Sequence, residues 1–375
     1  MRQLSSDVAI IGAGVVGAAC AYFLTEMGHS PTIIDPMEQG AATPAGAGIV
    51  APGVTFHPSP YYFPLAYRAV SYLEGLVDKL GNERLLERCG LLYLITDPRS
   101  PVDAESLARQ LRRHGMEGAP MHGHVEVIDP EYVHRYFPLL VPSQGAVYVD
   151  GPGRLNGANL RDALLLQAIK RGAHYIRARA SIDSISQQEI ALKADSTIIT
   201  TQRIVLAAGA WSRQIIGQFS AVSLPIIPQR GQILHLEVPD TRTDQWPIVM
   251  GDFPHYLLTF PVCKVLAGAT HEDVGFHPKP TLAGIREIAD TIYKVAPSLG
   301  SARLLGVNVG LRPVTPDGLP IIGRVPDLPS VIVASGHGAY GLQLGPYTGM
   351  LAAQLATDQE PDMDLTPYSP LRFSS

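Results

Sequence analysis

Asp7-Val-Ala-Ile-Ile-Gly12-Ala-Gly14-Val-Val-Gly17, followed downstream by Thr32-Ile-Ile-Asp35, is typical of a strand, a tight turn, a helix and a second strand. Val8, Ile10 and Ile11 predict a short buried strand, and apolar residues at helical spacing continue to Met27, where Gly28 stops the helix. Asp35 ends the second strand about 20 residues beyond the turn. A Gly-x-Gly-x-x-Gly turn in this setting predicts a dinucleotide site.

Each part of this unit has a role in dinucleotide binding. Gly12, Gly14 and Gly17 allow a tight turn and a close approach of the backbone, and the helix N-terminus stabilises a pyrophosphate. Asp35 is expected to accept hydrogen bonds from a ribose diol. The alternative is a glycine turn in a buried strand–helix–strand unit that binds nothing. The presence of every part together favours binding.

Composition restricts the class of protein. The chain has 375 residues, 46% of them hydrophobic and 17% charged, which predicts a globular enzyme of two domains with a large core. The net charge of −5, without a basic stripe, argues against nucleic-acid binding. The three cysteines and the histidines match no metal-ligand spacing, so no metal site is predicted. Six histidines are expected to be surface or loop residues rather than metal ligands: His57, His122, His124, His255, His271 and His277.

The first strand begins by Asp7, which leaves no room for a signal peptide, and no apolar run is long enough for a membrane helix. A cytoplasmic protein is therefore expected. Residues 50–64 are rich in proline and aromatic side chains. We expect a rigid loop over a cleft there; peripheral docking at the inner face of a membrane is the less favoured alternative.

Later segments alternate between helical and strand patterns. Helices are predicted over residues 65–80, 103–114, 159–171 and 282–295, and after Asp129-Pro130. Strands are predicted at 91–95, 175–176, 181–182, 204–206, 232–238, 255–260 and 264–269. The fold class is therefore α/β (α+β, two-domain), in which a Rossmann-like parallel domain is interrupted by an inserted antiparallel-sheet domain.

Several motifs occur in the order found in one known family: Leu206-Ala-Ala-Gly209-Ala-Trp211-Ser212, Arg230-Gly231-Gln232, Gly268-Ala-Thr270, Gly310-Leu-Arg312-Pro with Thr315-Pro-Asp317-Gly318, and Gly336-His337-Gly338. Over nearly its whole length the chain resembles the FAD-dependent amine and amino-acid oxidoreductases, glycine oxidase above all, then D-amino-acid dehydrogenase and sarcosine oxidase. The resemblance implies an FAD-binding domain of residues 1–85, 145–218 and 303–375, and a substrate-binding domain of residues 86–144 and 219–302.

The resemblance also places FAD on matching positions. Val15 and Val16 are expected along the pyrophosphate, Asp35 and Pro36 at the adenosine ribose, and the backbone of Ile182 at the adenine. Further binding residues are expected at Ala42, Thr43, Ala47, Gly48, Ile49, Gly209 and Trp211. A Gly-rich turn into a helix presents N–H donors to negative charge. The residues of that turn, expected to wrap the pyrimidine end of the isoalloxazine, are His337, Gly338, Ala339, Tyr340, Gly341, Leu342 and Gln343.

Two residues are predicted to be catalytic. In the family, the arginine of Gly-Leu-Arg-Pro binds the substrate carboxylate, and the planar guanidinium of Arg312 suits such a bidentate pair. Tyr256 matches a tyrosine that lines the substrate side of the flavin. The alternatives are an arginine that only bridges the two domains and a tyrosine that only packs within its strand. Arg230 is expected to form buried hydrogen bonds in the sheet.

Three departures from the family pattern bear on the substrate and the cofactor. Some glycine oxidases have a second arginine where this chain has Ala339, so the site is expected to be less cationic and roomier. The strand after Tyr256 is altered to Thr259-Phe-Pro261. No cysteine follows Cys263, so the covalent link of sarcosine oxidase is excluded and FAD is expected to be non-covalent.

These features predict oxidation of the Cα–N bond of a small amino acid: glycine, a D-amino acid, or a cyclic or N-methyl amino acid. A hydride passes from Cα to flavin N5, the imine hydrolyses to a 2-oxo acid, and Arg312 supplies mainly orientation. The acceptor (oxygen, a quinone or an electron-transfer partner) is left open, as is a homo-oligomer. The alternatives are a flavin subunit of a hetero-oligomeric dehydrogenase, and oxidation of a 2-hydroxy acid or glycerol 3-phosphate.

Overall fold

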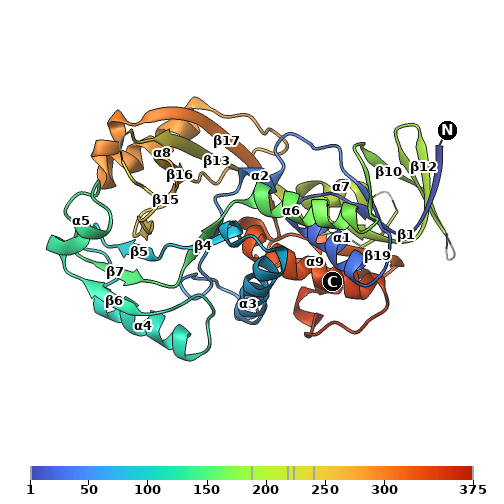
Figure 1. The fold of residues 1–375 in the computed structure, drawn as a ribbon, viewed down its shortest axis with the longest axis horizontal. Coiled ribbons are helices and arrows are strands. Elements are labelled where there is room, and N and C mark those ends of the chain that lie inside the picture. Colours follow the sequence, from blue (N-terminus) through green and yellow to red (C-terminus); the bar gives the residue numbers. More distant parts are fainter. Residues whose placement is uncertain (1, 187–188, 218, 223, 240, 374–375) are drawn as a thin grey trace.

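The computed structural model describes residues 2–186, 189–217, 219–222, 224–239 and 241–373. Two lobes lie side by side, each with an eight-stranded sheet, and α2 (Ala42–Ala45) and α3 (Tyr62–Leu80) lie between them (Figure 1). The predicted α/β class with two domains is confirmed.

The first sheet is Rossmann-like, as predicted. Its centre consists of five parallel strands in the order β9-β2-β1-β12-β19, and β10, β11 and β18 extend it with antiparallel pairing. The strands are β1 (Arg2–Ile11), β2 (Thr32–Ile34), β9 (His174–Ile176), β10 (Ala180–Ile185), β11 (Ile190–Ala194), β12 (Thr197–Leu206), β18 (Ile321–Val325) and β19 (Leu328–Ser335).

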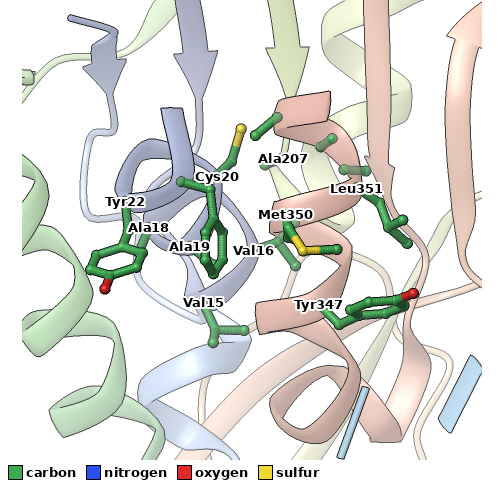
Figure 2. Close-up of a cluster of buried hydrophobic side chains, with 14 of the residues drawn as sticks. Val15, Val16, Ala18, Ala19, Cys20, Tyr22, Ala207, Tyr347, Met350 and Leu351 are labelled. Atoms are coloured by element: carbon green, nitrogen blue, oxygen red, sulfur yellow. The ribbon is translucent and has the colours of Figure 1, made fainter. Parts of the chain in front are cut away.

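Helices α1 (Val15–Glu26), α6 (Gly157–Lys170) and α9 (Gly341–Ala356) share one hydrophobic core with this sheet. Small residues let α1 and α9 approach closely, since a Cβ added at Gly349 would lie 2.6 Å from the Cβ of Ala19. Figure 2 shows Val16 and Met350 between the two helices. This packing fixes the N-termini of α1 and α9 relative to each other.

The second sheet has the order β17-β13-β16-β15-β14-β5-β7-β6 and is antiparallel except between β14 and β5. One face packs on α5 (Val133–Tyr136) and α8 (Leu282–Val295), and the other on α4 (Ala104–Met116). The strands are β5 (Leu91–Leu94), β6 (Val125–Ile128), β7 (Ala146–Val149), β13 (Ile227–Glu237), β14 (Ile248–Gly251), β15 (Tyr256–Phe260), β16 (Lys264–Gly268) and β17 (Arg303–Val314).

Smaller elements connect the two sheets. A three-stranded sheet is formed by β3 (Ile49–Val50), β8 (Gly153–Leu155) and β4 (Leu86–Arg88), and α7 (Ser212–Ile216) follows β12. The domain boundaries stay a proposal. Because β7 and β17 pair within the second sheet, we place the boundaries predicted at residues 145 and 303 after Val149 and Val314 instead.

Two local predictions need correction. The first strand is longer than predicted: it begins at Arg2, because residues 2–6, which have no apolar strand pattern, pair with Thr197–Thr201 of β12. Asp129 does not cap an α-helix: its side chain forms no capping bond, and a 3-10 turn over Pro130–Tyr132 precedes the single turn of α5. In the described part of the chain, no helix is long and apolar enough to cross a membrane.

Candidate active site

A cavity of about 680 Å³ lies between the two sheets, a size within the range of known ligand sites. One wall consists of residues that follow the parallel strands, such as Gly12 after β1 and Asp35 after β2. The other wall includes Ile233 of β13 and Met250 of β14. Open α/β sheets bind their ligands at the carboxyl ends of the strands, so this is the expected place for a cofactor.

The N-terminus of α1 faces this cavity. Gly14 precedes the helix without a side-chain cap, and the N–H of Val15 donates to Thr43 Oγ1 at 2.9 Å. Gly12 has a φ of 102°, and a Cβ there would lie 2.4 Å from the carbonyl oxygen of Ala207. The backbone turn therefore requires glycine, and the partial positive charge of the helix N-terminus favours an anion.

Asp35 lies half-buried beside the same turn. Its carboxylate accepts the N–H of Ala13 at 2.5 Å, which fixes its orientation. Ile182 of β10 lines the cavity on this side, where Arg179 and Glu38 form an ion pair at 2.6 Å. These residues form the end of the cavity expected to hold the adenosine.

The turn that leads into α9 is held in place by two of its own side chains. His337 is buried, its Nε2 lies 3.0 Å from Thr348 Oγ1, and burial lowers its pKa to about 4, so the imidazole is neutral at pH 7. Gln343 donates to the hydroxyl of Tyr62 at 2.5 Å and accepts the N–H of Ala51 at 3.3 Å. Both side chains are occupied within the protein, which leaves the backbone of the turn to face the cavity.

Arg312 reaches the cavity from β17. Because Gln229 of β13 pairs with Arg312, Gly231 lies two residues further along the same face. A Cβ on Gly231 would lie 2.7 Å from Cζ and both terminal nitrogens of the guanidinium. Nη1 donates to the carbonyl oxygen of Thr270 at 2.9 Å, and no carboxylate among the described residues pairs with Arg312. Burial lowers its pKa, yet a guanidinium stays protonated at neutral pH.

Tyr256 and His271 line the cavity with Arg312. Burial raises the pKa of Tyr256, so it is a neutral phenol. His271 Nδ1 lies 3.0 Å from Gln229 Oε1, and Gln229 in turn donates to Asp273 Oδ1 at 3.2 Å. Gln229 therefore accepts the Nδ1 hydrogen and Nε2 is left as an acceptor. Burial and the nearby Arg312 charge lower the pKa of His271, which favours the neutral ring.

The sequence-based site residues meet at this one cavity, with one exception. Gly17 does not line it: a Cβ there would lie 1.9 Å from the carbonyl oxygen of Gly12, so glycine is needed for packing on the turn. The predicted residues that line the cavity are Gly12, Gly14, Val15, Val16, Asp35, Pro36, Ala42, Thr43, Ala47, Gly48, Ile49, Ile182, Gly209, Trp211, Tyr256, Arg312, His337, Gly338, Ala339, Tyr340, Gly341, Leu342 and Gln343.

Other lining residues were missed by the sequence analysis. Ile233 and Met250 look like ordinary strand residues, and no sequence signal distinguishes them. His271 lies in a loop, as expected, but its place on the cavity wall was not predicted. Its position directly after Gly268-Ala-Thr270 is a signal that could have found it. Arg230 is buried and pairs with Glu272, which confirms its expected role in the sheet.

The donor set suits FAD. The N-terminus of α1 is placed for a pyrophosphate, Asp35 for a ribose diol, and the turn into α9 for the negative charge of a flavin. No group of three metal-ligating side chains occurs among the residues described.

Comparison with known proteins identifies the family. The family model described as FAD dependent oxidoreductase (DAO) matches residues 7–355. The chain belongs to this family. It is therefore an FAD-dependent oxidoreductase, and FAD is its cofactor. The described lining of the cavity contains no cysteine, which supports non-covalent binding.

Three relatives illustrate how far the similarity extends. "Uncharacterized oxidoreductase YurR" of Bacillus subtilis (strain 168) is 33% identical, covering 96% of this chain and 97% of its own. The crystal structure of iminodiacetate oxidase (IdaA) from Chelativorans sp. BNC1 superposes with a TM-score of 0.91 at 32% identity, and the match covers 97% of this chain and 98% of that chain. The crystal structure of glycine oxidase from Geobacillus kaustophilus superposes with a TM-score of 0.86 at 27% identity, and the match covers 98% of this chain and 99% of that chain.

Proposed function

We propose that this oxidoreductase oxidises the Cα–N bond of a small amino acid: glycine, a D-amino acid, or a cyclic or N-substituted amino acid. One observation carries the proposal. Arg312 extends a half-buried guanidinium into the cavity, and no carboxylate among the described residues neutralises it. A carboxylate of the substrate is the natural partner, because a planar guanidinium can bind both of its oxygens.

The surroundings of Arg312 limit the substrate further. The other charged side chains on the lining, Asp35, Glu38 and Arg179, lie toward the first sheet. The second sheet contributes Ile233, Met250 and Tyr256, which are apolar or uncharged. We therefore expect Arg312 to bind one carboxylate of the substrate, and the second sheet to contact the uncharged parts of the substrate. The similarity to iminodiacetate oxidase supports including N-substituted amino acids.

The roles of the chain's own residues follow from this placement. Arg312 binds the carboxylate and fixes the direction of Cα, which converts binding energy into orientation. The neutral His271 and Tyr256 do not repel a substrate ammonium, and Nε2 of His271 can accept its proton so that the amine reacts as the free base. FAD, when bound, supplies the two-electron acceptor. The resulting imine adds water and gives a 2-oxo acid and ammonia or an amine.

Anaerobic reduction of the FAD-loaded protein tests this proposal. The panel contains glycine, D-alanine, D- and L-proline, sarcosine, iminodiacetate and glycolate, and loss of the flavin absorbance is followed for each. We expect bleaching by at least one amino acid and none by glycolate. Bleaching by glycolate alone would instead indicate a hydroxy-acid dehydrogenase. Repeating the productive reaction with oxygen or with a quinone identifies the acceptor.

Two variants complete the test. Arg312→Ala removes two charge-assisted hydrogen bonds, each worth about 1.5–3 kcal/mol, so kcat/KM is expected to fall by about 100-fold or more. Arg303→Ala is the matched control, because Arg303 lies on the same strand but is 70% exposed and pairs with Glu237. Equal activity of the two variants would rule out Arg312 as the carboxylate anchor.

A further inference from the structure

We propose that Glu272 is a positioning residue, which holds the carboxylate anchor Arg312 in place through Thr270. This inference rests on the proposed role of Arg312 and adds the residues that orient its guanidinium.

Thr270 is the contact between Glu272 and Arg312. Its carbonyl oxygen accepts Nη1 of Arg312 at 2.9 Å. Its hydroxyl donates to Oε1 of Glu272 at 2.7 Å and accepts the N–H of Gln232 at 3.0 Å. Both functions of the hydroxyl are therefore used, and the segment that carries the carbonyl is fixed.

Glu272 is itself held by several donors. Arg230 Nη2 pairs with Oε2, Gln232 Nε2 donates to Oε1 at 2.7 Å, and Arg230 and Glu272 also exchange two backbone hydrogen bonds of 2.8 and 3.0 Å. Although burial raises the pKa of Glu272, the hydrogen bonds from Arg230, Gln232 and Thr270 lower it to about 2. Glu272 is therefore ionised throughout the working pH range.

Arg230, Gly231 and Gln232 are consecutive residues of β13 and contact different partners on its two faces. Successive side chains of a strand point to opposite faces. Arg230 and Gln232 bind Glu272, whereas Gly231 between them lies against the guanidinium of Arg312. The guanidinium is thus confined between the backbone of Gly231 and the carbonyl of Thr270. A buried ion pair adds little to stability on average, so positioning is a physical reason to have Arg230 and Glu272 here.

The experiment measures carboxylate binding without turnover. The FAD-loaded protein is titrated with acetate and with acetamide, its uncharged counterpart, and the flavin absorbance change gives Kd for each. In Glu272→Gln we expect acetate to bind about tenfold more weakly and acetamide to bind as in the parent, since a displacement of the anchor of up to 1 Å has effects of this size or larger. The control is Glu237→Gln, at the end of β13, the strand that carries Arg230 and Gln232; the partner of Glu237, Arg303, is on the surface.

Thr270→Val is a second variant, which keeps the shape of the side chain and removes the hydroxyl that donates to Glu272 and accepts the N–H of Gln232. It is expected to weaken acetate binding in the same direction. The inference is wrong if both variants bind acetate as the parent does, or if they weaken acetate and acetamide equally. Arg312→Ala separates the two proposals. If Arg312→Ala binds acetate as the parent does, Arg312 is not the carboxylate anchor. If Arg312→Ala loses acetate binding while Glu272→Gln and Thr270→Val keep it, only the role of Glu272 is wrong.

Discussion

Replacing Gly231 by alanine is expected to damage catalysis by displacing Arg312. The added Cβ would lie 2.7 Å from Cζ, Nη1 and Nη2, whereas ordinary contacts begin near 3.4 Å, so the guanidinium must retreat by roughly 0.7 Å. A misplacement of about 1 Å in an enzyme can lower the rate by about 10²-fold. We therefore expect kcat/KM for the productive amino acid to fall between about tenfold and a hundredfold.

The matched control for this variant is Gly306→Ala. Gly306 lies on β17, the strand that also carries Arg312, and a Cβ there has no heavy atom within 4 Å. Steady-state kinetics and urea unfolding of both variants separate an effect on the anchor from an effect on the fold. If Gly231→Ala retains the kcat/KM of the parent, or loses activity only in proportion to its stability, the reasoning about the Gly231–Arg312 contact is refuted.

Three further predictions concern the cofactor and the titrating groups. Asp35→Asn replaces a charged hydrogen-bond acceptor by a neutral one, and hydrogen bonds to a charged group are worth about 1.5–3 kcal/mol each. We therefore expect FAD to bind about tenfold more weakly. An unchanged Kd for FAD in a fluorescence titration would show that Asp35 does not bind the cofactor. Since burial raises the pKa of Tyr256, the phenol stays neutral, and Tyr256→Phe should leave the shape of the kcat/KM profile from pH 7 to 9 unchanged; loss of a basic limb would contradict this. Burial lowers the pKa of His337 to about 4, below about 6.5 in the unfolded chain, so its contribution to stability is complete above pH 6.5 and falls by up to about 1.4 kcal/mol per pH unit toward pH 4. Urea unfolding at pH 7, 6 and 5 gives the free energy of unfolding at each pH. We expect this free energy to fall less steeply toward pH 5 in His337→Gln than in the parent, and an equal fall in both would argue against a buried neutral imidazole.

The first sheet could be predicted because its signals are local. The glycine turn, the apolar helix and Asp35 all lie within 30 residues, and short-range rules link each of them to strand–turn–helix geometry. The same rules failed for residues 2–6, which have no apolar strand pattern of their own and whose backbone pairs only because β12 continues beside it. They also failed at Asp129, where the chain forms only short turns and no long helix.

The anchor could be named from its motif, but its surroundings could not. Gly231 and Arg312 are far apart in the sequence, and only the register of β13 against β17 brings them together. Likewise His271 reaches the cavity wall through a hydrogen bond to Gln229, which no local pattern encodes. The pairing register and the long-range contacts of side chains are tertiary properties, and these decided the environment of Arg312.

The most direct test of Arg312 as the carboxylate anchor is a crystal structure of the FAD-loaded protein with acetate bound. We expect both carboxylate oxygens to lie within about 3 Å of guanidinium nitrogens of Arg312, beside the flavin. Acetate bound at another cation, or Arg312 turned away from the cavity to pair with a carboxylate of the protein, would contradict it.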